Sequence, residues 1–354
     1  MSIGASWTPS ARRGGGLPAA CVCFAAMGHA AIPVAVVGAG NMGRHHARNY
    51  YEMPEADLRA IVDVDSRSRD ALAERFACRP LGTVKELVAE IPEVEAVSVA
   101  VPTSLHREVA GSLLESGKHV LVEKPIAATL AEATELVDLA ESRSLTLAVG
   151  HIERFNPALG ELRRLMDGGS LGRPLSLLAR RVGVMPPQIK DANVILDLAI
   201  HDLDVFRFLL DAELPEEIYC NAGKAIAQDR YDFADIFVRF GEVGCYLQTN
   251  WLTPVKIRSL TLTGTEAYAE LEYVTQELRL HAGRAFDPVS SFSDIEAYSE
   301  HAPVQIRVEK EEPLRREIRE FIEASAGRVS TVVTGRDGLT SLAVALSAVD
   351  AAAR

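Results

Sequence analysis

Residues 32–43 constrain this chain more than any other stretch. Six apolar residues, Ile-Pro-Val-Ala-Val-Val, run directly into Gly-Ala-Gly-Asn-Met-Gly. The apolar run is typical of a buried parallel strand, and residues 42–51 can follow it as a helix. In the pattern G-x-G-x-x-G, the first glycine allows a tight turn, the second lets the main chain approach a pyrophosphate, and the third allows close packing of helix on strand. The predicted dinucleotide site comprises Gly38, Gly40, Asn41, Met42 and Gly43.

Three glycines in six residues also occur by chance, so the surrounding pattern decides the matter. Residues 58–62 are apolar enough for a second strand, which ends at Asp63. A carboxylate at this place accepts hydrogen bonds from the ribose hydroxyls of the cofactor and repels a 2′-phosphate. The sequence therefore favours NAD over NADP, although Arg67 is a nearby cation that could accommodate the phosphate.

The alternation of strands and helices continues as far as Gly150. Strands are expected at residues 96–101, 118–122 and 145–149, and helices at 66–76, 84–90, 105–116 and 130–142. Strands that alternate with helices of this length form a parallel, doubly wound sheet. Residues 32–150 are therefore predicted to be one α/β domain.

The pattern changes after residue 150. Helices are expected at residues 157–166 and 194–210, and closing helices at 314–326 and 335–354. Strands are expected at residues 174–182, 218–226, 232–240, 244–250, 256–263, 267–273, 278–281 and 304–308. Short turns between period-two strands favour antiparallel hairpins. Residues 151–354 are thus predicted to be an α+β domain with a mostly antiparallel sheet, and residues 286–303, which are polar, a mobile loop.

Composition excludes several classes of function. The formal charge of −12 argues against a nucleic-acid surface, which needs concentrated Lys and Arg. No apolar run reaches the roughly 18 to 20 residues that span a bilayer. The five cysteines are odd in number and form no C-x-x-C pair, which indicates a reducing compartment and no zinc site. We expect a cytoplasmic protein.

Residues 1–31 are expected to be a leader outside the fold. Arg12-Arg13 followed by an apolar stretch loosely imitates a twin-arginine signal peptide. The apolar part is short, contains Pro18 and ends directly against the first strand. A disordered leader with Met27 as the working start is the favoured interpretation, and periplasmic export is the alternative.

Two groups of residues could perform chemistry. Glu123-Lys124-Pro125 follows a predicted parallel strand, at the edge where open α/β sheets bind ligands. Asp197 and His201 lie four apart on a predicted helix and hence on one face. The carboxylate could orient the imidazole and stabilise its protonated form, as a general base requires. A strand-end charge pair and a solvated helix face are the plain structural alternatives.

Other polar residues are weaker candidates for a functional role. Asp204 could join Asp197 and His201 as a metal ligand, but no cysteine or second histidine supports a metal, and none is predicted. His106 could contact the cofactor or pack beneath it. The arginines Arg173, Arg180 and Arg181 could pair with phosphates or carboxylates, although surface arginines are common.

With these motifs in view, the chain resembles the glucose–fructose oxidoreductase / inositol dehydrogenase / MocA family. The resemblance rests on the glycine motif, Asp63, Pro102-Thr103-x-x-His106, residues 117–125 and Asp197-x-x-x-His201, and it extends from residue 32 to the last helix. It implies a Rossmann domain and a second domain with an open-faced sheet that carries substrate specificity and the contact of a homodimer or tetramer. It further implies that Pro102, Thr103, His106, Glu123 and Lys124 contact the cofactor, and that Lys124, Asp197 and His201 form the catalytic group beside the nicotinamide.

Within the family, residues 150–157 and 250–258 look most like those of members that oxidise a UDP-N-acetylhexosamine at the sugar 3-hydroxyl. This resemblance implies that Arg154 and Asn156 face the substrate cleft. The predicted substrate-binding residues are these two with Arg181, Lys124, Asp197 and His201. A dehydrogenase of free polyols, inositols or aldoses is the second interpretation. A catalytically silent NAD-binding regulator is the third.

Overall fold

The computed structural model describes residues 31–185, 192–282 and 303–354. Residues 1–30 of the predicted leader and residues 286–302 of the predicted mobile loop lie outside these ranges. In the part of the chain described, no helix is long and apolar enough to cross a membrane.

The N-terminal part forms a six-stranded parallel sheet in the order β3-β2-β1-β4-β5-β6. The strands are β1 (Ile32–Val37), β2 (Ala56–Val62), β3 (Arg79–Leu81), β4 (Ala96–Val99), β5 (His119–Glu123) and β6 (Leu147–Gly150). The order reverses between β1 and β4, which places the glycine motif after β1 at the point where such sheets bind ligands. The predicted doubly wound sheet is confirmed.

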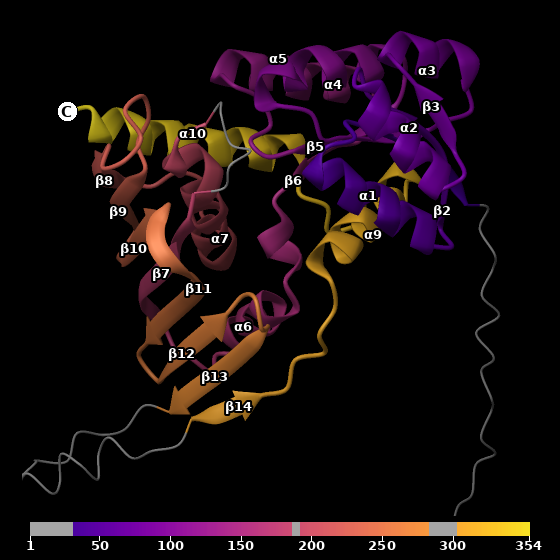
Figure 1. The fold of residues 1–354 in the computed structure, drawn as a ribbon. Helices are drawn as coiled ribbons and strands as arrows, with labels where there is room; N and C mark the ends of the chain where they lie inside the picture. The colour runs from indigo at the N-terminus through magenta and orange to yellow at the C-terminus, as the bar shows by residue number, and fades with distance from the viewer. Residues whose placement is uncertain (1–30, 186–191, 283–302) are drawn as a thin grey trace, which may run out of the picture. The chain divides into compact units, whose positions relative to one another are not determined.

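Helices cover both faces of this sheet (Figure 1). They are α1 (Asn41–Glu52), α2 (Ser66–Arg75), α3 (Val84–Glu90), α4 (His106–Glu115) and α5 (Leu130–Ser142), with the short 3₁₀ helix η1 (Thr103–Leu105) before α4. Helix α5 begins at a complete capping box, in which Thr129 and Glu132 each bond the other's backbone N–H. Helices α3, α4 and α5 pack on one face, and α1 and α2 on the other.

The C-terminal part forms an eight-stranded sheet in the order β14-β13-β12-β11-β7-β10-β9-β8. The strands are β7 (Pro174–Val184), β8 (Glu217–Gly223), β9 (Phe233–Phe240), β10 (Val243–Asn250), β11 (Leu252–Gly264), β12 (Ala267–Glu272), β13 (Glu277–Ala282) and β14 (Val304–Ile306). Only the pairing of β7 with β10 is parallel among these described strands. The predicted, mostly antiparallel sheet is confirmed.

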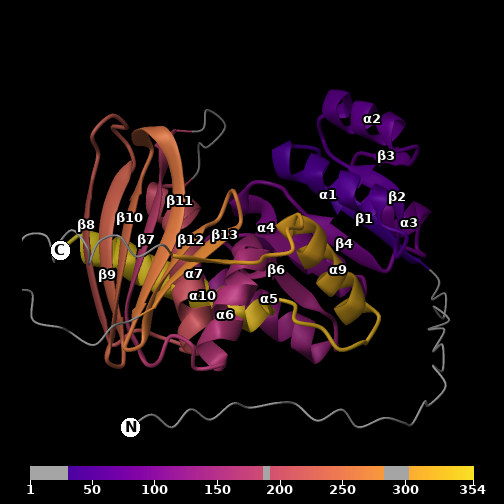
Figure 2. The ribbon, with the colours of Figure 1, turned by 90° about the horizontal axis from the view of Figure 1, so that it is seen from below.

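One face of the second sheet is covered by helices (Figure 2). They are α6 (Pro157–Asp167), α7 (Ile200–Leu210) and α10 (Gly335–Ala352). The opposite face carries an apolar row across four strands, formed by Leu178, Tyr246, Phe237 and Tyr219 in register. Leu178, Tyr246 and Tyr219 are 45%, 49% and 63% exposed, so the described residues leave this face bare.

The last two helices differ from the sequence prediction, which placed them in the second domain. Leu314, Ile318 and Phe321 of α9 (Pro313–Ser325) are buried in the same cluster as β1 and α1. Leu342 of α10 is buried against the opposite face of the first sheet, whereas Val344 belongs to the core of the second. The periodicity of a helix shows that one face is apolar but not which core receives it.

Glu317 on α9 is a buried acid that faces the first sheet. It is 1% exposed, and among the described residues neither carboxyl oxygen has a hydrogen-bond partner. Burial, with a smaller contribution from the charge of Glu123, raises the pKa of Glu317 well above its ordinary value. The folded protein therefore retains a proton that the unfolded chain releases, so stability falls as pH rises from the unfolded pKa to the folded one.

Replacement Glu317→Gln should remove this loss of stability, because the amide carries no titrating proton. We expect the unfolding free energy of the variant, minus that of the wild type, to grow by about 1.4 kcal/mol per pH unit above about pH 5. Urea unfolding at pH 5, 6 and 7 measures the difference. Glu309→Gln, at a side chain 90% exposed, is the matched control. A difference that does not change with pH would contradict the assignment.

Candidate active site

The glycine turn after β1 leaves no room for side chains at two of its three glycines. Gly38 has φ +103°, and a Cβ there would lie 2.5 Å from the carbonyl oxygen of Ala100. A Cβ on Gly43 would lie 1.7 Å from the carbonyl oxygen of Gly38. A Cβ on Gly40 would meet nothing within 4 Å, so the space above this residue is open. Two glycines thus build the turn, and the third faces space that a ligand can enter.

Asp63, which follows β2, is hydrogen-bonded to the same turn. Its Oδ2 accepts a hydrogen bond from the backbone N–H of Ala39 at 2.6 Å, and its Oδ1 accepts one from Asp65 at 2.8 Å. Helix α1 begins with Gly40 as N-cap and has no side-chain cap, so its first N–H groups remain available to an anion. The open space over Gly40 and the uncapped helix start fit the diphosphate of a dinucleotide.

A lysine from the first sheet is bound to the second domain. The Lys124 Nζ donates to the backbone oxygen of Asp197 at 2.7 Å and to its carboxylate Oδ1 at 3.0 Å. The two side chains are 15% and 16% exposed, so the pair is partly shielded from water. An ammonium group has three donors, and two are used here. The third remains for an oxygen of a bound molecule.

Asp197 does not orient His201 as the spacing predicts. Residues 194–210 were expected to be one regular helix, but η3 (Ile195–Ala199) is a π-helix that precedes α7. A π-helix turns through more residues than an α-helix, so residues four apart no longer share one face. The Asp197 carboxylate pairs with Lys124, and the buried Nδ1 of His201 has no hydrogen-bond partner in the described part of the chain.

The surroundings of His201 are cationic. Burial and the charges of Lys124, Arg181, His151 and Arg258 lower the pKa of His201 well below its ordinary value of 6.5. This contradicts the expectation that a carboxylate stabilises its protonated form. The imidazole is therefore neutral at neutral pH, with a nitrogen free to accept a proton.

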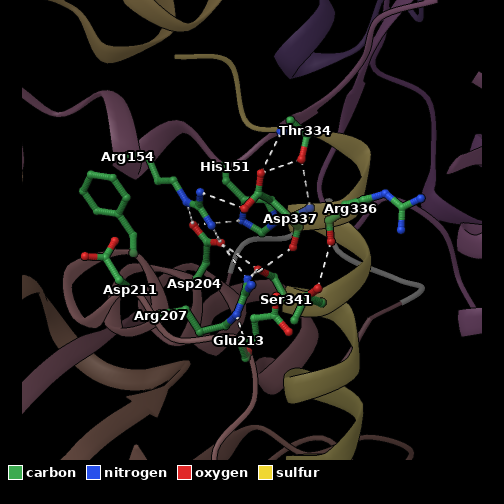
Figure 3. Close-up of polar contacts among 12 residues, drawn as sticks. His151, Arg154, Asp204, Arg207, Asp211, Glu213, Thr334, Arg336, Asp337 and Ser341 are labelled. Carbon is green, nitrogen blue, oxygen red and sulfur yellow. Dashed lines mark hydrogen bonds and ion pairs between the residues drawn. The ribbon is translucent and has the colours of Figure 1, made fainter. Parts of the chain in front are cut away.

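Two predicted substrate-binding residues have hydrogen-bond partners within the fold. The guanidinium of Arg154 donates two hydrogen bonds to the Asp204 carboxylate, at 2.7 and 2.6 Å, and a third to Asp337 at 3.2 Å (Figure 3). Asn156 is 2% exposed, accepts from Ala158 N as the N-cap of α6, and donates to the backbone oxygen of Tyr273. The polar atoms of both residues are engaged within the fold, and substrate binding by them stays a prediction.

Arg181 also has partners within the fold, and a second arginine lies beside it on the neighbouring strand. Arg181 is 4% exposed and pairs with Asp202 at 2.5 Å and Glu153 at 2.8 Å, and its binding of substrate stays a prediction. Arg258 lies opposite Arg181 on β11. Its Nη1 donates to the backbone oxygens of Val182 and Ile257, but it has no acidic partner among the described residues.

His106 is buried between the turns that follow β4 and β5. It is 1% exposed, and its Nδ1 and Nε2 lie 2.8 and 3.0 Å from the backbone oxygens of Pro125 and Val101. Its predicted cofactor contact stays a prediction. Pro102 is exposed and Thr103 is partly exposed at the carboxyl end of β4, so both remain accessible.

The two acids that the sequence analysis weighed and set aside as metal ligands have different partners. Asp197 pairs with Lys124, whereas Asp204 pairs with Arg154 and accepts from Ser341 at 2.6 Å. Within the described ranges, no three His, Cys, Asp or Glu side chains converge as metal ligands would.

Sequence reasoning missed three residues near the site. Glu123 Oε1 lies 2.9 Å from Nε2 of His46, a residue of α1. His151 is 1% exposed, with Nδ1 3.7 Å from Asp204 Oδ2. Arg258 is the third. Helical spacing with the packed Gly43 could have identified His46 as a buried face residue, whereas only the fold brings His151 and Arg258 near His201.

Family models match both parts of the chain. Residues 32–151 match the model described as "Oxidoreductase family, NAD-binding Rossmann fold", and residues 160–270 match the "GFO/IDH/MocA C-terminal domain". The first domain is therefore an NAD-binding Rossmann domain.

Individual proteins are similar over nearly the whole chain. The UDP-N-acetylglucosamine 3-dehydrogenase of Acidithiobacillus ferrooxidans is 31% identical over 313 residues, which is 88% of this chain and 94% of that protein. A solved structure of that enzyme superposes with a TM-score of 0.79 at 28% identity, covering 91% and 97% of the two chains. Inositol 2-dehydrogenase 2 of Saccharopolyspora erythraea is 30% identical over 324 residues, 88% and 90% of the two chains.

Proposed function

Because this chain belongs to the GFO/IDH/MocA family of NAD-binding oxidoreductases, we propose that it oxidises the 3-hydroxyl of a UDP-N-acetylhexosamine. The observation that carries the proposal is the meeting of Lys124, from the first domain, with Asp197, from the second, close to a neutral His201. Bound NAD supplies the hydride acceptor for such an oxidation.

NAD is proposed to lie along the carboxyl edge of the first sheet. Gly38, Gly40, Asn41, Met42 and Gly43 would hold its diphosphate at the start of α1. Asp63 would accept hydrogen bonds from the adenosine ribose. Pro102 and Thr103, with Glu123 and Lys124 of the next strand, would line the nicotinamide half, since β4 and β5 are neighbours in the sheet.

Lys124 acts on the substrate oxygen. Asp197 fixes the ammonium through two hydrogen bonds, and the third donor points a positive charge at the hydroxyl that is oxidised. A fixed cation stabilises the negative charge that develops on this oxygen as its proton leaves. Asp197 thus positions Lys124 rather than the histidine.

His201 is the proposed general base. The lowered pKa keeps its imidazole unprotonated, so it can accept the hydroxyl proton. The cations that surround it also disfavour the imidazolium once formed, which promotes release of the proton after each turnover.

Arg258 favours a substrate that carries a diphosphate. Its charge acts on His201, so it lies near the reacting oxygen, and it has no acidic partner in the described part of the chain. Burial, with the adjacent charge of Arg181, lowers the pKa of Arg258. An anionic ligand would therefore stabilise the charged guanidinium. Its Nη1 is held by backbone oxygens, which leaves its other donors for phosphate oxygens.

An inositol or another free polyol is the second candidate substrate. The inositol dehydrogenase of S. erythraea is similar over almost the same length as the nucleotide-sugar enzyme. A neutral polyol, however, would offer Arg258 no charge with which to form a direct ion pair.

The bare face of the second sheet supports a homo-oligomer. Phe237 packs between Tyr219 and Tyr246 with ring centroids 6.1 and 5.0 Å apart. Such a continuous apolar row is typical of a protein–protein contact. We propose that two copies of the chain associate through it.

Variants Lys124→Met and His201→Asn should each lower kcat by about 100-fold or more. Because the His201 pKa is lowered, the acid limb of wild-type kcat/KM should lie below pH 6.5. Lys124→Met removes one cause of that lowering, so the acid limb of its residual activity should move to higher pH. Initial rates of NADH formation measure both effects.

Lys256→Met and His45→Asn, at exposed residues, are the matched controls and should retain wild-type rates. Near-normal turnover of both test variants would refute the catalytic assignment. Tight NAD binding without turnover of any sugar would favour a silent regulator.

UDP-N-acetylglucosamine and UDP-N-acetylgalactosamine should be oxidised with higher kcat/KM than myo-inositol, scyllo-inositol or glucose. Arg258→Met should raise the KM for the nucleotide sugar by about 10- to 100-fold, because a charge-assisted contact is lost. Arg180→Met, at an exposed residue of β7, should leave KM unchanged. A preference of the wild type for an inositol would overturn the substrate proposal.

Tyr246→Glu should convert the oligomer to a monomer, because a charge would be buried without a partner. Light scattering after size exclusion measures the mass. Tyr51→Glu, at a residue 59% exposed on α1, is the control. A monomeric wild type would refute this contact.

A further inference from the structure

A chain of buried polar side chains runs behind the turn that carries Lys124. The Tyr50 hydroxyl and Ser98 Oγ lie 2.7 Å apart, and Ser98 Oγ and His46 Nδ1 lie 3.0 Å apart. His46 Nε2 lies 2.9 Å from Glu123 Oε1. Tyr50 and Ser98 are 0% exposed and His46 is 1% exposed, so water does not compete for these bonds.

The direction of this chain follows from the charge of Glu123. Burial alone would raise the pKa of Glu123, but the hydrogen bond and charge of His46, with the charge of Lys124, lower it overall. An ionised carboxylate only accepts hydrogen bonds, so the proton lies on His46 Nε2. When the imidazole is neutral, Ser98 donates to Nδ1 and Tyr50 donates to Ser98. Every donor in the chain has an acceptor, and the last acceptor is Glu123.

Glu123 connects this chain to the lysine. It immediately precedes Lys124, and its Oε2 accepts a hydrogen bond from Lys124 N at 3.3 Å. A Cβ on Gly150 would lie 3.0 Å from the same oxygen, so the neighbouring strand leaves just enough space for this carboxylate. On the other side of the turn, His106 Nδ1 lies 2.8 Å from the Pro125 oxygen. Two buried imidazoles therefore flank residues 123–125.

We propose that His46 is a positioning residue: through Glu123 it holds residues 123–125 so that the Lys124 ammonium remains aimed at the substrate oxygen. This inference rests on the proposed function of Lys124. His46 itself touches neither substrate nor reacting atoms. Its contribution is the orientation of one carboxylate, and a catalytic group displaced by 1 Å loses rate by about 100-fold.

Two substitutions of similar size separate this role from simple packing. His46→Gln places an amide donor where Nε2 stands and can still bind Glu123. His46→Asn places its amide where Nδ1 stands and can bind only Ser98. We expect His46→Asn to lower kcat by about 100-fold at saturating NAD and substrate, and His46→Gln to stay within a few-fold of wild type.

Binding of NAD alone gives a second readout that is independent of turnover. Isothermal titration calorimetry should show a higher Kd for NAD with His46→Asn than with His46→Gln, at matched melting temperatures. Equal losses in both variants, or no loss in His46→Asn, would overturn the proposal. Should His46→Asn fail to accumulate, Glu123→Gln tests the same contact without a change of shape, and an unchanged kcat there would equally overturn it.

A double substitution and one control complete the design. The losses of His46→Asn and Glu123→Gln should not add in the double variant, because both act through one contact; additive losses would count against the proposal. Lys124→Met distinguishes a failure of this inference from a failure of the proposed function. If Lys124→Met is inactive and His46→Asn is wild-type, only this inference fails, whereas an active Lys124→Met removes the proposed function itself.

Discussion

The contact between Lys124 and Asp197 is the interaction on which the site depends. It joins the carboxyl edge of a parallel sheet to a π-helical turn in another layer of the molecule, at 2.7 and 3.0 Å. Because the pair is mostly shielded, each charge relies on the other, and separating them would leave an uncompensated charge in a poorly solvated place. The lysine can therefore act as a fixed cation rather than as a mobile surface charge.

The cations around the His201 imidazole differ in whether a carboxylate neutralises them. Arg154 and Arg181 are neutralised by carboxylates that lie in the core of the second domain, whereas Lys124 and Arg258 retain donors beside His201. The result is a small region of positive potential within a chain whose formal charge is −12. An acidic protein can thus offer an anion a local site, because potential is set by nearby groups more than by net charge.

Much of the fold could be predicted from the sequence, since strand and helix periodicities, capping boxes and the glycine turn are local properties. The parallel sheet over residues 32–150 and the antiparallel pattern beyond it follow from them. Partners of polar side chains are not local properties. Arg154, Asn156 and Arg181 carry suitable chemistry for a ligand, but Asp204, Tyr273 and Asp202 reach them only in the folded chain. One π-helical turn was enough to redirect Asp197 from His201 to Lys124.

Because α9 packs on the first sheet, the two domains are not independent segments of the sequence. Leu314 and Phe321 of α9 complete a core that begins with β1, nearly 300 residues earlier in the 354-residue sequence. A nucleotide-binding domain truncated after β6 would therefore lack the α9 side chains that bury part of its core. A chimera of two relatives would have to take the first sheet and helix α9 from the same parent. Recombination at a single crossover would therefore rarely yield a hybrid that folds.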